Sequence, residues 1–202
     1  MGKFVKRIWI CLLTAVLIWC AGLLSDRQLL RSGIIRLHVV ANSDTREDQS
    51  VKLQVRDAVI QSIRTQLESI SDVEEARAYL HSSLPKLQKV ANKVLESAGV
   101  ESRAVVTLCK EAFDTREYDT FTLPAGVYES LRIVIGEGKG HNWWCVAFPS
   151  LCIPETREVF VQEASGTGLS EATCAALTAE DRTIRFFFLD KLGELENIFF
   201  EG

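Results

Sequence analysis

The chain begins with an uncharged run that does not suit the core of a globular domain. Basic residues (Lys3, Lys6 and Arg7) precede seventeen uncharged residues, 8–24, and Asp26 follows them. A core helix would carry one polar face, and this run has none. A basic flank, an apolar run and then a polar chain form the order of a secretory signal peptide or a signal anchor. The run lies at the short end of the length that spans about 30 Å of hydrocarbon.

Residues 1–25 are therefore predicted to be a signal peptide or transmembrane anchor, and residues 26–202 one domain outside the cytoplasm. The basic flank stays in the cytoplasm, which directs the domain outward. An uncleaved segment would hold the domain at the membrane. The whole chain carries a net charge of −4, so the part beyond the basic flank carries about −7. Such an acidic domain is a poor candidate for binding nucleic acid or anionic lipid surfaces.

Two long amphipathic helices are predicted in the first half of this domain. Apolar residues recur at four-residue spacing from Val51 to Leu67, and Thr45 is a suitable N-cap ahead of them. A second helical pattern runs from Leu80 to Leu95 and stops at Gly99, a residue that favours helix ends. Pro85 is expected to break or kink this second helix.

The strand predictions begin with residues 34–41, which are β-branched and apolar and suit a short strand buried on both faces. Residues 100–108 alternate with a period of two, as a half-buried strand does. The polar, β-prone segment 115–121 is expected to pair with that strand.

Further along, two apolar strands are predicted at residues 131–135 and 143–148, joined as a hairpin by a glycine-rich connection. Residues 184–200 are strongly apolar and are expected to form a strand followed by a helix. The predicted class is α+β: an N-terminal membrane or signal helix, then one domain of long amphipathic helices packed on a mostly antiparallel sheet.

Two patterns that suggest catalysis are weak. Residues 136–140 contain three alternate glycines and Lys139, but a phosphate-binding loop opens a helix, and here a strand-like segment follows. The glycines more plausibly supply positive φ angles in a tight connection. His141 and Cys145 suggest a thiol nucleophile with its base. On a strand they would lie on one face but about 13 Å apart, too far for direct contact.

No metal site, cofactor or catalytic residue is predicted. The three histidines lack metal-ligand spacing, and Asp44 and Asp48 are explained as helix-capping residues. No C-x-x-C pair occurs. Cys145 and Cys152 flank Pro149 and are the favoured disulfide in an exported domain, with a small buried free thiol as the alternative.

The pair Trp143 and Trp144 admits three interpretations: core packing, a sugar-stacking platform or a protein contact. Adjacent strand residues point to opposite faces, so one indole is expected to face the core and the other not. An outward tryptophan beside a glycine-rich loop is a credible docking anchor. A cell-envelope hydrolase or ligand-binding domain that uses Cys145 and His141, or the two tryptophans, is the alternative function.

Several stretches resemble the stage II sporulation protein R family. They lie in the family's order over residues 34–153: Ile35-Arg36-Leu37-His38-Val39-Val40-Ala41-Asn42-Ser43-Asp44, Lys52-Leu53-Gln54-Val55-Arg56-Asp57-Ala58, Leu123-Pro124-Ala125-Gly126-Val127-Tyr128, and Leu131 through Gly136-Glu137-Gly138-Lys139-Gly140-His141-Asn142-Trp143-Trp144-Cys145-Val146 to Pro149 and Cys152.

This resemblance implies a developmental signal of endospore-forming bacteria. Family members are made in the forespore and exported into the intermembrane space facing the mother cell. There they activate a membrane-embedded sporulation aspartic protease, which processes the pro-form of the early mother-cell sigma factor. The family supplies no catalytic residues to transfer, which implies a protein that is not an enzyme.

A set of polar and aromatic residues is predicted to contact the protease, chosen for polarity and position alone. These residues are Arg36, His38, Asn42, Asp44, Lys139, His141, Asn142 and Trp144.

Overall fold

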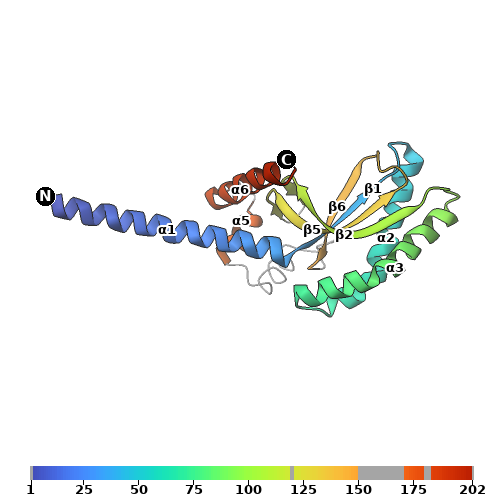
Figure 1. The fold of residues 1–202 in the computed structure, drawn as a ribbon, viewed down its shortest axis with the longest axis horizontal. Helices are drawn as coiled ribbons and strands as arrows, with labels where there is room; N and C mark the ends of the chain where they lie inside the picture. Colours follow the sequence, from blue (N-terminus) through green and yellow to red (C-terminus); the bar gives the residue numbers. More distant parts are fainter. Residues whose placement is uncertain (1, 119–120, 150–170, 180–182, 202) are drawn as a thin grey trace.

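The protein is described by a computed structural model that covers residues 2–118, 121–149, 171–179 and 183–201 (Figure 1). Its elements are α1 (Gly2–Gly33), β1 (Ile35–Val40), α2 (Arg46–Glu68), α3 (Val73–Ser97), β2 (Ala104–Phe113), β3 (Arg116–Glu117), β4 (Thr122–Leu123), β5 (Gly126–Ile135), β6 (Asn142–Phe148), α5 (Glu171–Leu177) and α6 (Ile184–Glu201).

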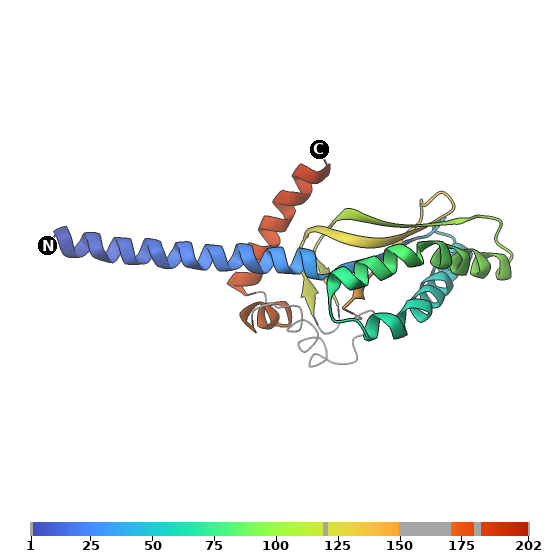
Figure 2. The same ribbon diagram turned by 60° about the horizontal axis from the view of Figure 1, so that its bottom comes forward.

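The N-terminal run forms the long helix α1, which projects away from the rest of the protein (Figures 1 and 2). Among the described residues, α1 is the one helix long and apolar enough to cross a membrane. Its apolar side chains are largely exposed up to Leu24, whereas Leu30 is buried against the domain. This division agrees with a signal or anchor segment whose helix continues into turns that pack on the domain.

The main sheet is mixed and has the strand order β2-β5-β1-β6. β1 pairs parallel to β5 and antiparallel to β6, while β2 pairs antiparallel to β5. All six residues of β1 are buried, as predicted. The predicted hairpin is wrong, because β1 lies between β5 and β6. The segment 115–121 does not extend the sheet either: β3 pairs with β4 in a separate two-stranded sheet.

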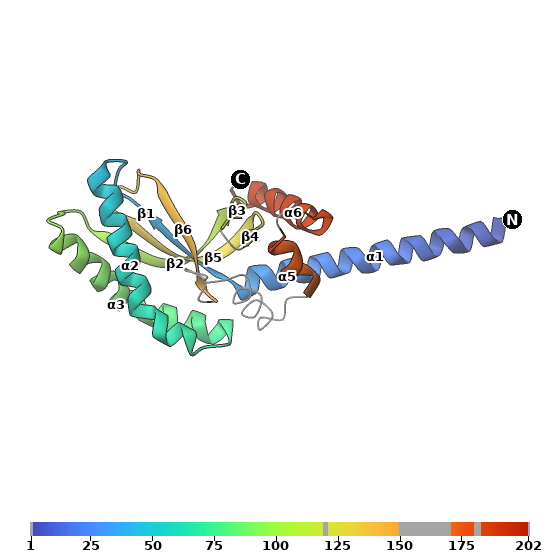
Figure 3. The ribbon, with the colours of Figure 1, turned by 180° about the vertical axis from the view of Figure 1, so that it is seen from behind.

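Helices α2 and α3 cover one face of the sheet (Figure 3). In α2 the stripe from Val51 to Leu67 is buried, and Thr45 caps the helix by accepting from the Asp48 backbone N–H. Of the break or kink predicted at Pro85, the break is wrong, because α3 continues through the proline. Leu80 and Leu87 are both fully buried on either side of the proline, so packing against the core holds the helix together.

The other face of the sheet meets the end of α1 together with α5 and α6. Leu30, Phe113, Tyr128 and Phe186 belong to this second apolar cluster. The predicted strand at the start of residues 184–200 is wrong, because α6 is helical from Ile184. The first and last helices, α1 and α6, therefore contact each other on the sheet face opposite the α2–α3 layer, while the N-terminal end of α1 projects away (Figure 1).

Candidate partner-recognition site

Two loops meet at the end of the sheet that is remote from α1 (Figure 1). One is the turn 41–45, between β1 and α2, and the other is the connection 136–141, between β5 and β6. We call this meeting point the loop junction. It exists because β1 pairs with both β5 and β6, so the ends of the three strands coincide.

Asn42 connects the two loops through its side chain and its backbone. Its Nδ2 donates to Oδ2 of Asp48 at 2.9 Å, and its Oδ1 accepts from the Glu137 backbone N–H at 3.0 Å. Its backbone carbonyl accepts from the Lys139 N–H at 3.1 Å. Both the Nδ2 and the Oδ1 atoms of Asn42 are thus hydrogen-bonded, and these bonds fix the position of the two loops relative to each other.

The glycines of residues 136–140 are required by the backbone. Gly136 and Gly138 have φ angles of +57° and +63°, as the tight connection predicts. Gly140 is needed for a different reason: an added Cβ would lie 2.2 Å from the Ser43 carbonyl oxygen. Its backbone N–H donates to the Ala41 carbonyl at 3.0 Å, so the two loops are in direct backbone contact.

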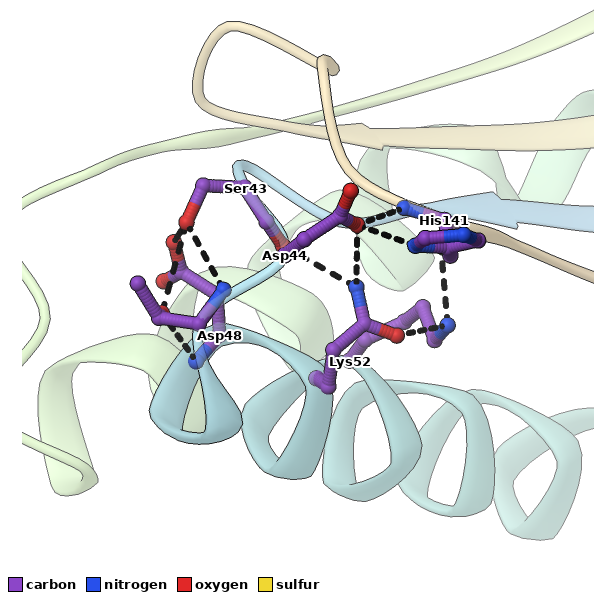
Figure 4. Close-up of polar contacts among 7 residues, drawn as sticks. Ser43, Asp44, Asp48, Lys52 and His141 are labelled. Atoms are coloured by element: carbon purple, nitrogen blue, oxygen red, sulfur yellow. Dashed lines mark hydrogen bonds and ion pairs between the residues drawn. The ribbon is translucent and has the colours of Figure 1, made fainter.

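Asp44, His141 and Lys52 form the polar centre of the loop junction (Figure 4). Oδ1 of Asp44 accepts from the His141 backbone N–H at 2.6 Å and also contacts the His141 ring Nδ1. These hydrogen bonds, the backbone one foremost, hold the pKa of the Asp44 carboxyl below its ordinary value. Nζ of Lys52 donates to the His141 carbonyl at 2.9 Å and to Oε1 of Gln49 at 2.6 Å.

Lys52 is a residue that the sequence prediction missed. Only 4% of it is exposed, and burial lowers the pKa of its ammonium group. It lies on the buried side of α2 beside Val51 and Val55, where a lysine interrupts an apolar pattern. That interruption was the available signal, because a buried lysine requires polar partners.

Asp48 supports the turn from the start of α2. Its Oδ2 accepts from the Ser43 hydroxyl at 2.6 Å and from the Asn42 side chain. The hydrogen bond from Ser43, followed by that from Asn42, lowers the pKa of the Asp48 carboxyl below its ordinary value. The Asp48 carboxylate therefore holds Asn42 and Ser43 of the loop junction against the first turn of α2.

We expect acid to destabilise the wild type more steeply than the Asp48→Asn variant. The folded-state pKa of Asp48 lies below the ordinary value of 3.8, so the unfolded chain takes up the proton first. The stabilisation is present above that ordinary value and is lost as pH falls through the folded-state pKa. Urea unfolding, followed by circular dichroism between about pH 5 and about pH 3, should give a shallower pH slope for Asp48→Asn.

A control for this titration is Glu101→Gln, which removes an exposed carboxylate outside the loop junction. It should retain the wild-type slope. Parallel slopes for Asp48→Asn and the wild type would contradict the proposed coupling.

The outer surface of the loop junction is polar and accessible. The His141 side chain is 80% exposed, and Lys139, also exposed, forms an ion pair with Glu137 at 2.6 Å. Asn142 is exposed at the start of β6. The structure therefore brings five of the eight predicted contact residues together: Asn42, Asp44, Lys139, His141 and Asn142.

The other three, Arg36, His38 and Trp144, form a separate group on the sheet face opposite α2 and α3. Arg36 is fully buried and His38 nearly so. Nδ1 of His38 contacts Oε1 of Glu111 at 3.1 Å, and its ring stacks on Trp144. Arg36 is not accessible to a partner in this conformation, so we leave it out of the contact surface proposed below.

The two adjacent tryptophans point to opposite faces of the sheet, as predicted. Trp143 is 38% exposed, and the Arg56 guanidinium of α2 lies 4.2 Å from its ring centroid. Trp144 is half-buried under Arg116, whose guanidinium lies 3.6 Å from its ring. Trp143 is thus the more accessible indole, and it lies on the side nearer α2.

The alternative function with Cys145 as a thiol nucleophile requires that Cys145 be a free thiol. Cys145 is buried and disulfide-bonded in this structure. Its predicted partner, Cys152, lies outside the described residues, so this pairing stays a prediction. Within the described part of the chain, no group of three or more His, Cys, Asp or Glu residues is arranged to hold a metal ion.

Comparison with known proteins assigns the chain to a family. The family model for stage II sporulation protein R matches residues 31–158. Stage II sporulation protein R of Bacillus subtilis (strain 168) is 42% identical over 118 residues, which cover 58% of this chain and 53% of the relative. The chain thus spans about half the length of the curated relative that it matches. No solved structure matches the chain. The protein belongs to the stage II sporulation protein R family.

Proposed function

We propose that this sporulation protein is an extracytoplasmic signal that activates a membrane-embedded aspartic protease. Activation would lead to processing of the pro-form of the early mother-cell sigma factor. Membership of the stage II sporulation protein R family supports the sporulation role. The single observation that carries the rest is the loop junction: an exposed, internally braced polar surface at the end of the domain remote from α1.

The position of this surface suits a signal between two membranes. α1, which is long and apolar enough to cross a membrane, would cross or leave the forespore membrane with its basic flank in the cytoplasm. The domain would then lie in the intermembrane space. The loop junction then faces away from the membrane that holds α1. A protease in the opposite, mother-cell membrane would meet this end of the domain first.

Activation by binding requires that the protein prefer the active state of the protease. Moving a two-state equilibrium from 1:99 to 99:1 takes about 5.5 kcal/mol of differential affinity. A preordered surface helps, because less binding energy is lost in ordering loops. The hydrogen bonds of Asn42 and Asp44 supply that order before any partner arrives.

The test is co-reconstitution of the full chain with the protease and its pro-sigma substrate. We expect the Lys139→Ala and His141→Ala double variant to reduce cleavage several-fold, because it removes exposed polar groups. The variant loses the contact between the His141 ring and Asp44, but it keeps the hydrogen bonds of Asn42 and the one from the His141 backbone N–H to Asp44. Thermal unfolding should stay close to that of the wild type, since surface substitutions change stability by less than about 0.5 kcal/mol.

A matched control is Lys89→Ala, which removes an exposed lysine from α3, away from the loop junction. Cleavage should then be unchanged. Normal cleavage with the double variant would reject the loop junction as the contact surface. If the wild-type chain neither binds the protease nor raises cleavage, direct activation is rejected altogether.

A further inference from the structure

The described part of the chain concentrates its exposed apolar side chains on two helices that touch each other. Outside α1 and α6, the large hydrophobic residues that are exposed are Leu53, Val105 and Trp143. On α6, Phe200 is exposed, and the other six form a stripe at helical spacing: Ile184, Phe187, Phe188, Leu195, Ile198 and Phe199. This helix lies beyond the residues that the family model matches.

The exposed stripe is separate from the face by which α6 packs on the domain. Phe186 and Leu189 are buried in the second apolar cluster. Gly193 approaches the Ala125 backbone so closely that no Cβ would fit. α6 thus has one apolar face buried in the domain and a second apolar face directed outward, with polar residues such as Asp190 and Glu194 between the two. Within the described chain no protein covers the outward face, which is therefore available to a partner or to lipid.

Contacts with α1 set the depth at which this stripe would lie in a membrane that α1 spans. The ring of Phe188 packs edge-on against Trp19, with centroids 5.2 Å apart. Trp19 lies five residues before Leu24, the last apolar residue of the N-terminal run, which is about 7–8 Å along the helix. Phe188 would therefore lie near the boundary between headgroups and acyl chains, the depth at which tryptophan rings also concentrate.

Ion pairs with the end of α1 that would lie outside the membrane also hold α6 in this position. Glu196 pairs with both Arg27 and Arg31, each at 2.7 Å. Figure 2 shows α6 crossing α1 obliquely, with its first turns beside the projecting part of α1. Lys191 interrupts the outward stripe, but it pairs with Glu194 and can extend its ammonium group to the surface.

We propose that the outward face of the first turns of α6, at Ile184, Phe187 and Phe188, lies in the outer headgroup region of the same bilayer that holds α1. An interfacial helix buries its apolar face about 5–10 Å into this boundary, which matches the contact between Phe188 and Trp19. The helix would fix the orientation of the domain on the membrane and direct the loop junction away from it. The proposal requires α1 in a bilayer, but it does not depend on the protease.

Photo-crosslinking of the full chain in lipid vesicles tests this directly. Phe187→p-benzoylphenylalanine adds a photoreactive ring at an outward position that is 52% exposed. Vesicles of phosphatidylethanolamine and phosphatidylglycerol would carry an alkyne on one acyl chain, so that lipid adducts can be tagged and counted. We expect several-fold more lipid adduct than with the same substitution at Val105, which is 54% exposed on β2. Ile184→p-benzoylphenylalanine provides a second position should Phe187 disturb folding.

Two results would overturn the proposal. Equal lipid adducts at α6 and at Val105 would mean that α6 has no preferred contact with the bilayer. Crosslinks from α6 to a second copy of the chain, in place of lipid, would assign the stripe to self-association. Because no protease is present, neither result bears on the proposed activation.

Discussion

Replacing Gly140 with alanine is expected to abolish activation of the protease while lowering the free energy of unfolding by about 1–3 kcal/mol. The added Cβ would lie 2.2 Å from the Ser43 carbonyl oxygen and 2.5 Å from its carbon. Both are backbone atoms, so one loop must move away from the other. Separation would break the hydrogen bonds to Ala41 and Asn42 and displace His141 from Asp44.

The matched control is Gly99→Ala, at the end of α3. Gly99 has a φ of +71° and open space around its Cβ position, so the substitution strains only its own backbone. That strain lowers stability by about 1–2 kcal/mol, a loss similar to that of Gly140→Ala. Co-reconstituted cleavage assays, paired with urea unfolding, separate the two effects. Activation retained by Gly140→Ala, or lost equally with Gly99→Ala, would show that the loop junction is not the recognition surface.

Local sequence patterns predict an individual helix or strand well where the same pattern of apolar residues continues along the whole element. β1 is buried on both faces because its residues are apolar and β-branched, and α2 follows its stripe from Val51 to Leu67. The break predicted at Pro85 does not occur, because the local rule takes no account of tertiary packing. Both Pro85 and His81, whose carbonyl loses its hydrogen bond, are exposed to water, which lowers the penalty for a proline inside α3.

The sheet order and the site could not be derived in this way, because both depend on pairing between distant segments. Nothing within residues 131–148 indicates that β1 lies between β5 and β6. Once it does, Asn42 and Asp44 necessarily meet residues 137–141. Choosing polar residues at the ends of strands was sufficient to identify residues of these two loops that lie together in the structure. It failed for Arg36, because polarity alone does not distinguish a buried cation from an exposed one.

Arg36 is predicted to be a core residue whose charge is dispensable. Its guanidinium lies 4.0 Å from the Phe113 ring centroid and donates to the Tyr118 hydroxyl at 2.8 Å. Among the described residues, no carboxylate pairs with it, and its Nε and Nη1 atoms have no hydrogen-bond partner. A desolvated cation–π contact contributes about 2 kcal/mol and a hydrogen bond about 1 kcal/mol. Desolvating the charge costs several kcal/mol, which offsets both.

Arg36→Met should therefore unfold within about 1 kcal/mol of the wild type or be more stable, because methionine fills the space without a buried charge. Arg36→Ala should lose about 2–5 kcal/mol, because it leaves a cavity beside Phe113 and Tyr128. Urea unfolding of the two variants distinguishes volume from charge. Equal losses would mean that the guanidinium itself is required. Activation of the protease should survive in Arg36→Met; a folded but inactive variant would return Arg36 to the contact surface and imply that the sheet face opens when the partner binds.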